Sequence, residues 1–292
     1  MTAQIIDGKA IAQRIRAEVA AEVANRTAAG KLRPTLATVL VGDRADSAAY
    51  VSSKGKACME LGMGSISEHL PADATQAQVE ELVKRLNSDP LVSGILVQLP
   101  MPAQIDEERV LSLINIEKDV DGFSPVNIGR LAQKGRQPLF VPCTPYGCIY
   151  LLEQAGLKIE GANAVVLGRS NIVGMPAALL LISRNATVTV CHSRTRDLPG
   201  TVRRADILIA AIGKTEMVRG DWIKPGAAVI DVGINSIPDS TKKSGHRLVG
   251  DVKFDEASQV AGWITPVPGG VGPMTIAMLM KNTLRAAQIQ QP

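Results

Sequence analysis

The sequence predicts an α/β fold in which helices pack on parallel strands. Hydrophobic residues make up 46% of the 292 positions but aromatic residues only 3%, so Ala, Val, Ile and Leu supply the apolar content. This composition suits helices that cover parallel strands better than an aromatic-rich β-sandwich. Short β-branched apolar runs also alternate with segments of helical periodicity. That order predicts parallel sheets, in which ligands bind beyond the carboxyl ends of the strands.

The first half of the chain opens with a helix. Asp7 is a candidate N-cap, and apolar residues recur at four-residue spacing from Ile11 to Val23, so we expect a helix that ends near Gly30. The run at 94–99 is almost continuously apolar, as in a strand buried on both faces. The other expected elements are strands at 35–41 and ending at Leu70, and helices at about 47–61 and 75–86.

The second half repeats the alternation after a segment rich in Pro, Cys, Thr and Gly at about 138–147, where we place a domain linker. We therefore expect two domains, 1–140 and 141–273. A glycine- and proline-rich loop from Trp263 precedes a C-terminal helix at about 274–287. The other expected elements are strands near 164–167, 187–191, 207–211 and 229–232, and a helix at about 174–184.

Charge and hydropathy exclude some classes of function. The net charge is only +4, and the basic residues are scattered, which argues against nucleic-acid binding and fits either small anionic ligands or an ordinary surface. No apolar stretch is long enough to span a bilayer, and the N-terminus lacks the apolar region of a signal peptide. We expect a cytoplasmic protein without a membrane or nucleic-acid partner.

The cysteines and histidines indicate neither a metal site nor disulfides. No CxxC pair or partnered histidine spacing is present, so the cysteines are expected to be reduced thiols. The histidines are dispersed, and no metal is expected. The residues in question are Cys58, Cys143, Cys148, Cys191, His69, His192 and His246.

A candidate dinucleotide site lies at the turn between the strand at 164–167 and the following helix. The chain leaves an apolar strand at Gly168-Arg169-Ser170 and enters the helix at Gly174, so backbone N–H groups at the helix start could hold a pyrophosphate. The Gly-x5-Gly spacing departs from the common GxGxxG pattern. An ordinary tight turn therefore remains the alternative.

The end of the next strand favours NADP over NAD as the cofactor. NAD-binding domains usually carry a carboxylate there for the ribose 2′-hydroxyl, whereas this chain has Ser193 and Arg194. Arg169 adds a second cation, and guanidinium groups bind a 2′-phosphate through charge-assisted hydrogen bonds. A solvated surface side chain is the alternative for Arg194.

Candidate chemical residues lie in the first half. Tyr50 and Lys54 lie one helical turn apart, and a desolvated lysine has a lowered pKa suited to proton transfer near neutral pH. A surface lysine beside a packed tyrosine is the alternative. Gln98 is polar at the carboxyl end of an apolar strand, where ligands bind. Asp121, before a glycine, is either a turn former or a carboxylate aimed at a heterocycle.

In the second half of the chain, Asp231 and Asp251 are expected only to cap or position loops.

Together these motifs resemble the bifunctional methylenetetrahydrofolate dehydrogenase/cyclohydrolase family over essentially the whole chain. The motifs that carry the resemblance are Ile6-Asp7-Gly8-Lys9, Val41-Gly42-Asp43, Tyr50-Val51-x-x-Lys54, Val97-Gln98-Leu99-Pro100, Asp119-Val120-Asp121-Gly122, Gly168-Arg169-Ser170, Ile172-Val173-Gly174-x-Pro176 and Pro266-Val267-Pro268-Gly269-Gly270-Val271-Gly272-Pro273-Met274-Thr275.

The resemblance implies two α/β domains flanking a cleft, with a Rossmann-like NADP-binding second domain, a first domain completed by the helix at 274–292, and a homodimer. Lys54 would be the catalytic lysine, Gln98 would orient it, Tyr50 would stack on the folate and Asp121 would hold the pterin. Tetrahydrofolate derivatives would be the substrates. The implied substrate contacts are Tyr50, Val51, Ser52, Ser53, Lys54, Val97, Gln98, Leu99, Asp121, Pro268, Gly269, Gly270, Val271 and Gly272, and the cofactor contacts are Gly168, Arg169, Ser170, Ser193 and Ile234, to which the charge argument adds Arg194.

Two other functions fit parts of the pattern. A different NADP-dependent oxidoreductase, such as a shikimate-dehydrogenase-like enzyme, would share the layout but would not need Asp121 beside Gln98. A nucleotide-sensing protein would bind NADP without turning over a folate, and the set of Tyr50, Lys54, Gln98 and Asp121 argues against it.

Overall fold

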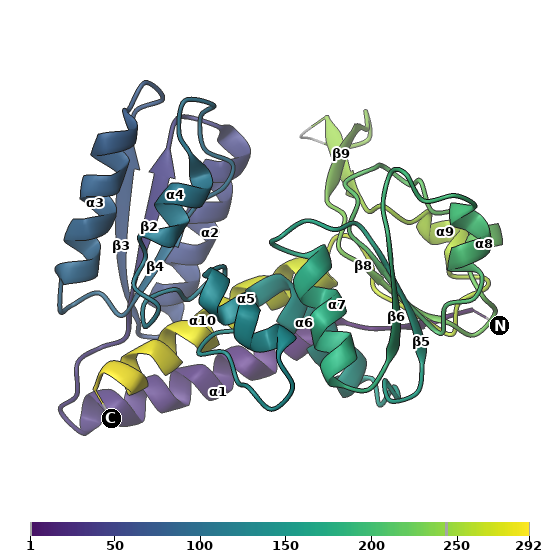
Figure 1. Cartoon of the computed structure of the whole chain (residues 1–292), viewed down its shortest axis with the longest axis horizontal. Coiled ribbons are helices and arrows are strands. Elements are labelled where there is room, and N and C mark those ends of the chain that lie inside the picture. The colour runs from purple at the N-terminus through teal and green to yellow at the C-terminus, as the bar shows by residue number, and fades with distance from the viewer. Residues whose placement is uncertain (1, 243–244, 292) are drawn as a thin grey trace. The chain divides into compact units, whose positions relative to one another are not determined.

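The computed structural model describes residues 2–242 and 245–291. The chain divides into two compact units, which Figure 1 traces. The three-stranded unit comprises Gln13–Cys143 and Ile276–Pro292, and the six-stranded unit comprises Met1–Ala12 and Thr144–Thr275.

The three-stranded unit is built on a parallel sheet, as the alternation predicted. Its strand order is β3-β2-β4, formed by β3 (Gly64–Leu70), β2 (Thr35–Val41) and β4 (Gly94–Val97). Figure 1 shows helices α2 (Ala45–Glu60) and α3 (Gln76–Ser88) on opposite faces of this sheet. Because both faces are covered, every residue of β4 is buried.

Local sequence explains why α3 packs where it does. The Thr75 side chain accepts a hydrogen bond from the backbone N–H of Gln78, and the Gln78 side-chain oxygen accepts one from the backbone N–H of Thr75; together they form a capping box. The apolar side of α3, including Val79 and Val83, lies in one core cluster with residues of β2 and β4. The unit also holds two short helices that were not predicted, α4 (Glu107–Ser112) and α5 (Pro125–Ala132).

The two long helices predicted at the ends of the chain are present and lie side by side. Asp7 caps α1 (Gly8–Ala28) by accepting a hydrogen bond from the backbone N–H of Ala10 at 3.0 Å. The buried Arg26 of α1 donates to the carbonyls of Ala287 and Gln291, both at 2.9 Å, at the end of α10 (Val271–Gln290). The Ala287 carbonyl also accepts from the backbone N–H of Gln291 at 3.0 Å, so Arg26 adds a second donor to one carbonyl at this helix end and reaches the carbonyl of Gln291 just beyond it.

The six-stranded unit is also built on a parallel sheet. The strand order is β1-β11-β8-β7-β5-β6, and neighbouring strands among the described residues pair in parallel. Residues 1–12 belong to this unit because β1 pairs with β11, a pairing too short to leave a periodic signal. The strands are β1 (Gln4–Ile5), β5 (Asn163–Leu167), β6 (Thr187–Cys191), β7 (Ile207–Ala210), β8 (Ala228–Asp231) and β11 (Trp263–Ile264).

Several elements of this unit differ from expectation. The expected linker at 138–147 contains the start of helix α6 (Cys143–Gln154), because Pro145 fits a first helical turn. Strands β9 (Asn235–Pro238) and β10 (His246–Val249) form an antiparallel hairpin that was not predicted. The remaining elements are α7 (Gly174–Ser183), α8 (Leu198–Val202), η1 (Gly220–Trp222) and α9 (Phe254–Ala257).

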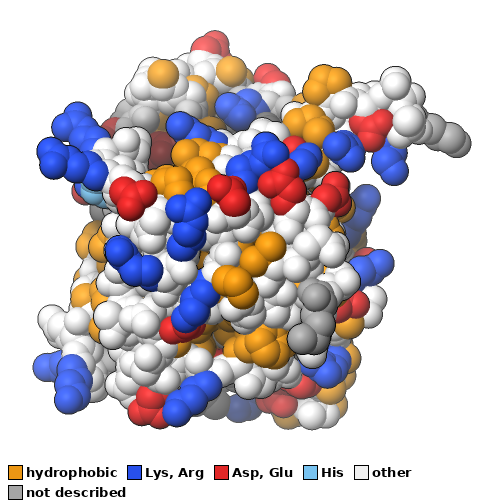
Figure 2. All heavy atoms as spheres, turned by 90° about the vertical axis from the view of Figure 1, so that its right-hand side faces the viewer, with side chains coloured by type: hydrophobic (Ala, Val, Ile, Leu, Met, Phe, Trp, Pro, Cys, Tyr) orange, Lys and Arg blue, Asp and Glu red, His pale blue; other side chains and the backbone are white. Residues whose placement is uncertain are grey.

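The surface is mixed in charge. On the face shown in Figure 2, basic and acidic side chains are interspersed among apolar ones. Within the residues that the structure describes, no helix combines the length and the apolar character needed to cross a membrane.

Candidate functional site

Lys54 lies on the buried face of α2. It falls at helical spacing with the buried residues Val51, Ala57 and Cys58, and the residue is only 9% exposed. Its amine donates a hydrogen bond to Gln98 Oε1 at 2.9 Å. The structure therefore places this lysine in a desolvated position and not on the solvated surface.

Gln98 is fixed so that its carbonyl oxygen faces the lysine. It follows β4, and its backbone N–H donates to the carbonyl of Val39 at 2.9 Å. Its side-chain amide donates to the carbonyl of Leu99 at 2.8 Å, which leaves Oε1 for the lysine. This pairing joins a helix and a strand end that are 44 residues apart in the sequence.

Asp121 and Cys143 complete the electrostatic environment of the lysine. Burial lowers the pKa of Lys54, and the negative charge of Asp121 opposes this shift. Burial raises the pKa of Asp121, while Lys54 and a hydrogen bond from Cys143 act in the other direction. Burial and Asp121 raise the pKa of Cys143 well above its usual value, so its thiol stays protonated. An amine with a lowered pKa beside a carboxylate is suited to moving protons near neutral pH.

The turn that carries Asp121 is held by its neighbour Asp119. The buried Asp119 carboxylate accepts hydrogen bonds from the backbone N–H groups of Phe123 and Ser124 and from the Asn127 side chain, at 2.8–3.1 Å. Asp119 therefore forms the turn. Asp121 interacts with Lys54 and Cys143 instead.

The other residues predicted around Lys54 differ in exposure. Tyr50 is 42% exposed, although it lies one turn before the lysine. The Ser53 hydroxyl donates to the carbonyl of Ala49 at 2.9 Å. Val51 and Val97 are buried, Leu99 is half-buried, and Ser52 and Ser53 are exposed.

Asn282 and Cys143 contribute to this site and were missed by sequence reasoning. The buried Asn282 of α10 donates to the carbonyls of Val120 at 2.8 Å and Val141 at 3.0 Å, and to Cys143 Sγ at 3.5 Å. It thus connects the segment before Asp121 to the segment before Cys143. A single asparagine within the apolar stripe of α10 was the available signal, because a buried amide requires partners.

The predicted dinucleotide turn is a glycine turn between β5 and α7. Gly168 follows β5 with φ +109°, and a Cβ there would lie 2.1 Å from the carbonyl oxygen of Ala211, so only glycine fits. Ser170 Oγ accepts hydrogen bonds from the N–H groups of Val173 at 3.2 Å and Gly174 at 3.3 Å, where α7 begins. The turn therefore leads into a helix start, where the peptide dipoles favour an anion, while Ser170 itself occupies the N–H groups of Val173 and Gly174.

A cavity of about 310 Å³ lies at this turn. Arg169 and Lys214 supply cations to its wall, and none of the described lining residues is a carboxylate. Such a wall fits a phosphate-bearing dinucleotide. The lining residues are Leu167, Gly168, Arg169, Ser170, Cys191, His192, Ser193, Leu198, Ala211, Ile212, Lys214 and Met217.

Of the two arginines predicted to contact the cofactor, Arg169 belongs to the described lining of the cavity and Arg194 does not. Arg169 lines the cavity, as does Ser193. Arg194 is exposed, and among the described residues it is not part of the lining; its backbone N–H donates to His192 Nδ1 at 3.2 Å. Lys214 was not predicted as a lining residue, because it follows β7 in a part of the chain without a recognised motif.

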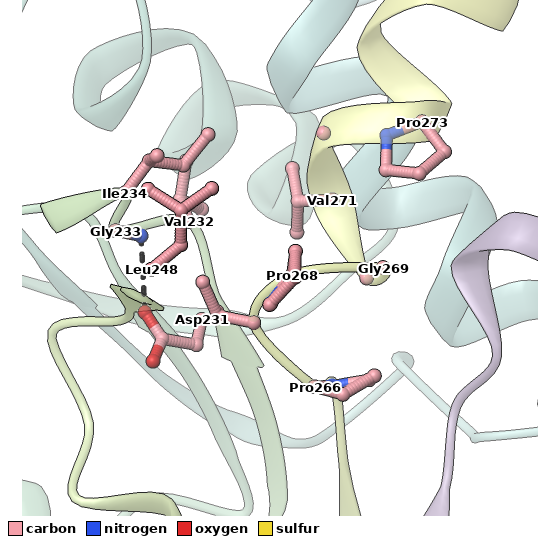
Figure 3. Close-up of a pocket in the computed structure, with 13 residues that line it drawn as sticks. Asp231, Val232, Gly233, Ile234, Leu248, Pro266, Pro268, Gly269, Val271 and Pro273 are labelled. Carbon is pink, nitrogen blue, oxygen red and sulfur yellow. Dashed lines mark hydrogen bonds between the residues drawn. The ribbon is translucent and has the colours of Figure 1, made fainter. Parts of the chain in front are cut away.

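A second pocket, of about 140 Å³, brings together two predicted segments. Ile234, expected as a cofactor contact, and the loop Pro268–Gly272, expected as a substrate contact, line the same space. Figure 3 shows these segments, with Asp231 accepting a hydrogen bond from the N–H of Gly233 at 3.0 Å.

Asp231, which lines this pocket, should make the stability of the fold depend on pH. Burial is the main cause that raises its pKa to about 7, and Asp251 contributes. The unfolded pKa is about 4, so between these values the folded state holds a proton that the unfolded state has lost, and stability falls as pH rises. We expect the free energy of unfolding to decrease by up to about 4 kcal/mol from pH ~4 to ~7 through this group.

The Asp231→Asn variant isolates this effect. Its denaturant unfolding should show lower stability overall but a flatter pH dependence between about pH 4 and 7 than the wild type. Parallel curves for the two proteins would show that Asp231 does not titrate in this range.

The cysteines, histidines and carboxylates were not expected to form a metal site. Over residues 2–242 and 245–291, no group of three or more His, Cys, Asp or Glu side chains is arranged to hold a metal ion. All four cysteines are free and buried.

Comparison with known proteins agrees with this geometry. Residues 6–121 match the family model for the catalytic domain of tetrahydrofolate dehydrogenase/cyclohydrolase, and residues 142–291 match the model for its NAD(P)-binding domain. The chain is 58% identical over 287 residues to Bifunctional protein FolD 2 of Arabidopsis thaliana, covering 98% of this chain and 96% of the relative.

Solved structures give the same result. The Trypanosoma brucei methylenetetrahydrofolate dehydrogenase-cyclohydrolase complexed with NADP cofactor and inhibitor superimposes with a TM-score of 0.95 at 47% identity, covering 99% of this chain and 98% of that one. Shikimate 5-dehydrogenase of Thermus thermophilus reaches a TM-score of 0.53 at 16% identity, covering 87% of this chain and 99% of that one, a likeness of fold alone. The chain belongs to the tetrahydrofolate dehydrogenase/cyclohydrolase family.

Proposed function

We propose that this protein oxidises 5,10-methylenetetrahydrofolate to 5,10-methenyltetrahydrofolate with NADP and then hydrolyses the product to 10-formyltetrahydrofolate. The observation that carries the proposal is the buried amine of Lys54, held by Gln98 at 2.9 Å beside Asp121. Family membership supplies the substrate class, and the cation-lined cavity at Gly168 fits a phosphorylated dinucleotide.

Lys54 would move the protons of the hydrolytic step. Water adds to the carbon of the methenyl cation, and the adduct must lose a proton from its new hydroxyl and gain one on nitrogen as the ring opens. An amine whose pKa is lowered by burial exchanges protons readily near neutral pH. Gln98 would keep this amine in place, because its own amide is fixed by Leu99.

Asp121 and Tyr50 would bind the folate. A carboxylate accepts hydrogen bonds from the amidine-like edge of a pterin. The exposed ring of Tyr50, one turn before Lys54, offers a face for stacking.

The dinucleotide, when bound, supplies the hydride acceptor for the oxidation. Gly168, Arg169 and Ser170 would bind its phosphates through the turn and the start of α7, with Ser193 nearby in the same lining. Arg194, Ile234 and the Pro268–Gly272 loop are further proposed contacts, of which Ile234 and the loop share the second pocket.

We also propose a homodimer in the cytoplasm. The family resemblance supports the dimer, and four free thiols are typical of a reducing compartment. Light scattering of the purified protein should give the mass of two chains; the mass of one chain would contradict the dimer.

The hydrolytic half of the proposal is tested without a dinucleotide. Purified protein mixed with methenyltetrahydrofolate should accelerate the loss of the methenyl absorbance over a buffer blank. A rate equal to the blank, from folded protein, would remove the cyclohydrolase function and leave the dehydrogenase to be tested separately.

A further inference from the structure

Asp251 holds one wall of the cation-lined cavity. It is completely buried, and its carboxylate accepts hydrogen bonds from three consecutive backbone N–H groups, those of Ile212 at 2.7 Å, Gly213 at 2.9 Å and Lys214 at 2.9 Å. Ile212 and Lys214 line the cavity at Gly168. The conformation of this wall therefore depends on a side chain that follows it by about forty positions in the sequence.

Asp231 holds Asp251 in turn and reaches the second pocket. Its carboxylate accepts hydrogen bonds from the N–H groups of Asp251 and Val252, both at 2.9 Å, and from Gly233 at 3.0 Å. Gly233 lines the pocket shown in Figure 3. The two carboxylates thus connect the walls of both pockets in the six-stranded unit.

Asp231 and Asp251 occupy space that is available only because Gly233 and Gly250 have no side chain. A Cβ on Gly233 would lie 2.4 Å from Asp251 N, and a Cβ on Gly250 would lie 1.8 Å from Asp231 Oδ2. Each aspartate therefore packs against a glycine of the other's segment. Burying a carboxylate is costly unless hydrogen bonds compensate, and here the backbone of the positioned loops supplies them.

We propose that Asp251, supported by Asp231, is a positioning residue of the dinucleotide site that fixes Ile212–Lys214 for contact with the bound cofactor. This inference rests on the proposed use of a dinucleotide. Ile212 and Lys214 line the cavity as a whole and are not confined to the place where a 2′-phosphate would bind. The binding of NADP and the binding of NAD should therefore depend on Asp251 to the same extent.

The Asp251→Asn variant tests the proposal. An amide of the same shape has one oxygen where the carboxylate has two, so part of the hydrogen bonding to the loop is lost. The Kd values for NADP and NAD, measured without folate, should each rise about tenfold. The KM for methenyltetrahydrofolate in the cyclohydrolase reaction should not change, because hydrolysis consumes no dinucleotide. A general loss of structure would change both the dinucleotide Kd values and this KM.

Asp119→Asn is the matched control. Asp119 is likewise a buried carboxylate that accepts two backbone N–H bonds and one asparagine side chain, but it belongs to the three-stranded unit. Its substitution should leave dinucleotide binding unchanged.

A milder variant covers the case in which Asp251→Asn does not fold. Asn235→Ala removes a 3.0 Å hydrogen bond to Asp251 and should raise both dinucleotide Kd values about threefold. Wild-type binding by a folded Asp251→Asn protein, or by Asn235→Ala if the first variant does not fold, would overturn the proposal. Failure of the wild-type protein to bind NADP would be a different result, since it would remove the cofactor assignment on which the proposal rests.

Discussion

The Lys54→Gln variant is expected to lose cyclohydrolase activity by about two to four orders of magnitude. Glutamine is neutral and does not exchange protons at neutral pH, whereas the buried lysine amine has a lowered pKa. Oxidation of methylenetetrahydrofolate should fall less, because hydride transfer does not require the water-derived proton to be moved. Both rates should be measured on one preparation, together with its thermal unfolding.

Lys56→Gln provides the control for this result. Lys56 lies two positions further along α2 and is exposed, so its substitution removes the same charge from the same helix without touching Gln98. We expect both activities to stay near those of the wild type. Full cyclohydrolase activity in a folded Lys54→Gln protein would remove the role assigned to this lysine.

The Arg169→Ala variant is expected to weaken NADP binding about 10- to 100-fold while changing NAD binding about twofold at most. Arg169 lines the cavity beside Ser193, where a guanidinium would contact the 2′-phosphate that only NADP carries. The measurement is the apparent KM for each cofactor in the dehydrogenase reaction.

The Arg194→Ala variant distinguishes the contribution of Arg194 to NADP binding from that of Arg169. Arg194 is exposed and outside the described lining, so we expect a smaller effect on NADP from its removal. Equal losses for NADP and NAD in Arg169→Ala would contradict the assignment of this residue to the 2′-phosphate.

Much of the fold follows from the sequence because the parallel sheets leave strong local signals. β4 and β8 are buried throughout, so β4 is a continuous apolar run and β8 is apolar up to its last residue, Asp231; α3 carries both a capping box and an apolar face. The elements that were missed lack such signals. β1 and β11 contain two residues each, β9 alternates half-buried and exposed positions over only four residues, and β10 does not alternate.

The site could be predicted only where a motif or an unusual polar position marked it. Local context made Lys54, Gln98 and Asp121 candidates, and only the family resemblance assigned their roles; no local rule states that Lys54 and Gln98 meet, since 44 residues separate them. Asn282 and Asp251 act through tertiary hydrogen bonds to backbone groups, and such bonds depend on folding the whole unit. Their contributions therefore appear only in three dimensions.

The most direct test of the proposed function is an assay of the purified protein with methylenetetrahydrofolate and either NADP or NAD, quenched with acid so that methenyltetrahydrofolate is measured. We predict product formation that depends on NADP and is much weaker with NAD. Absence of product with either cofactor, from folded protein that still binds NADP, would contradict the assignment and favour a dinucleotide-binding protein that acts on a different substrate or on none.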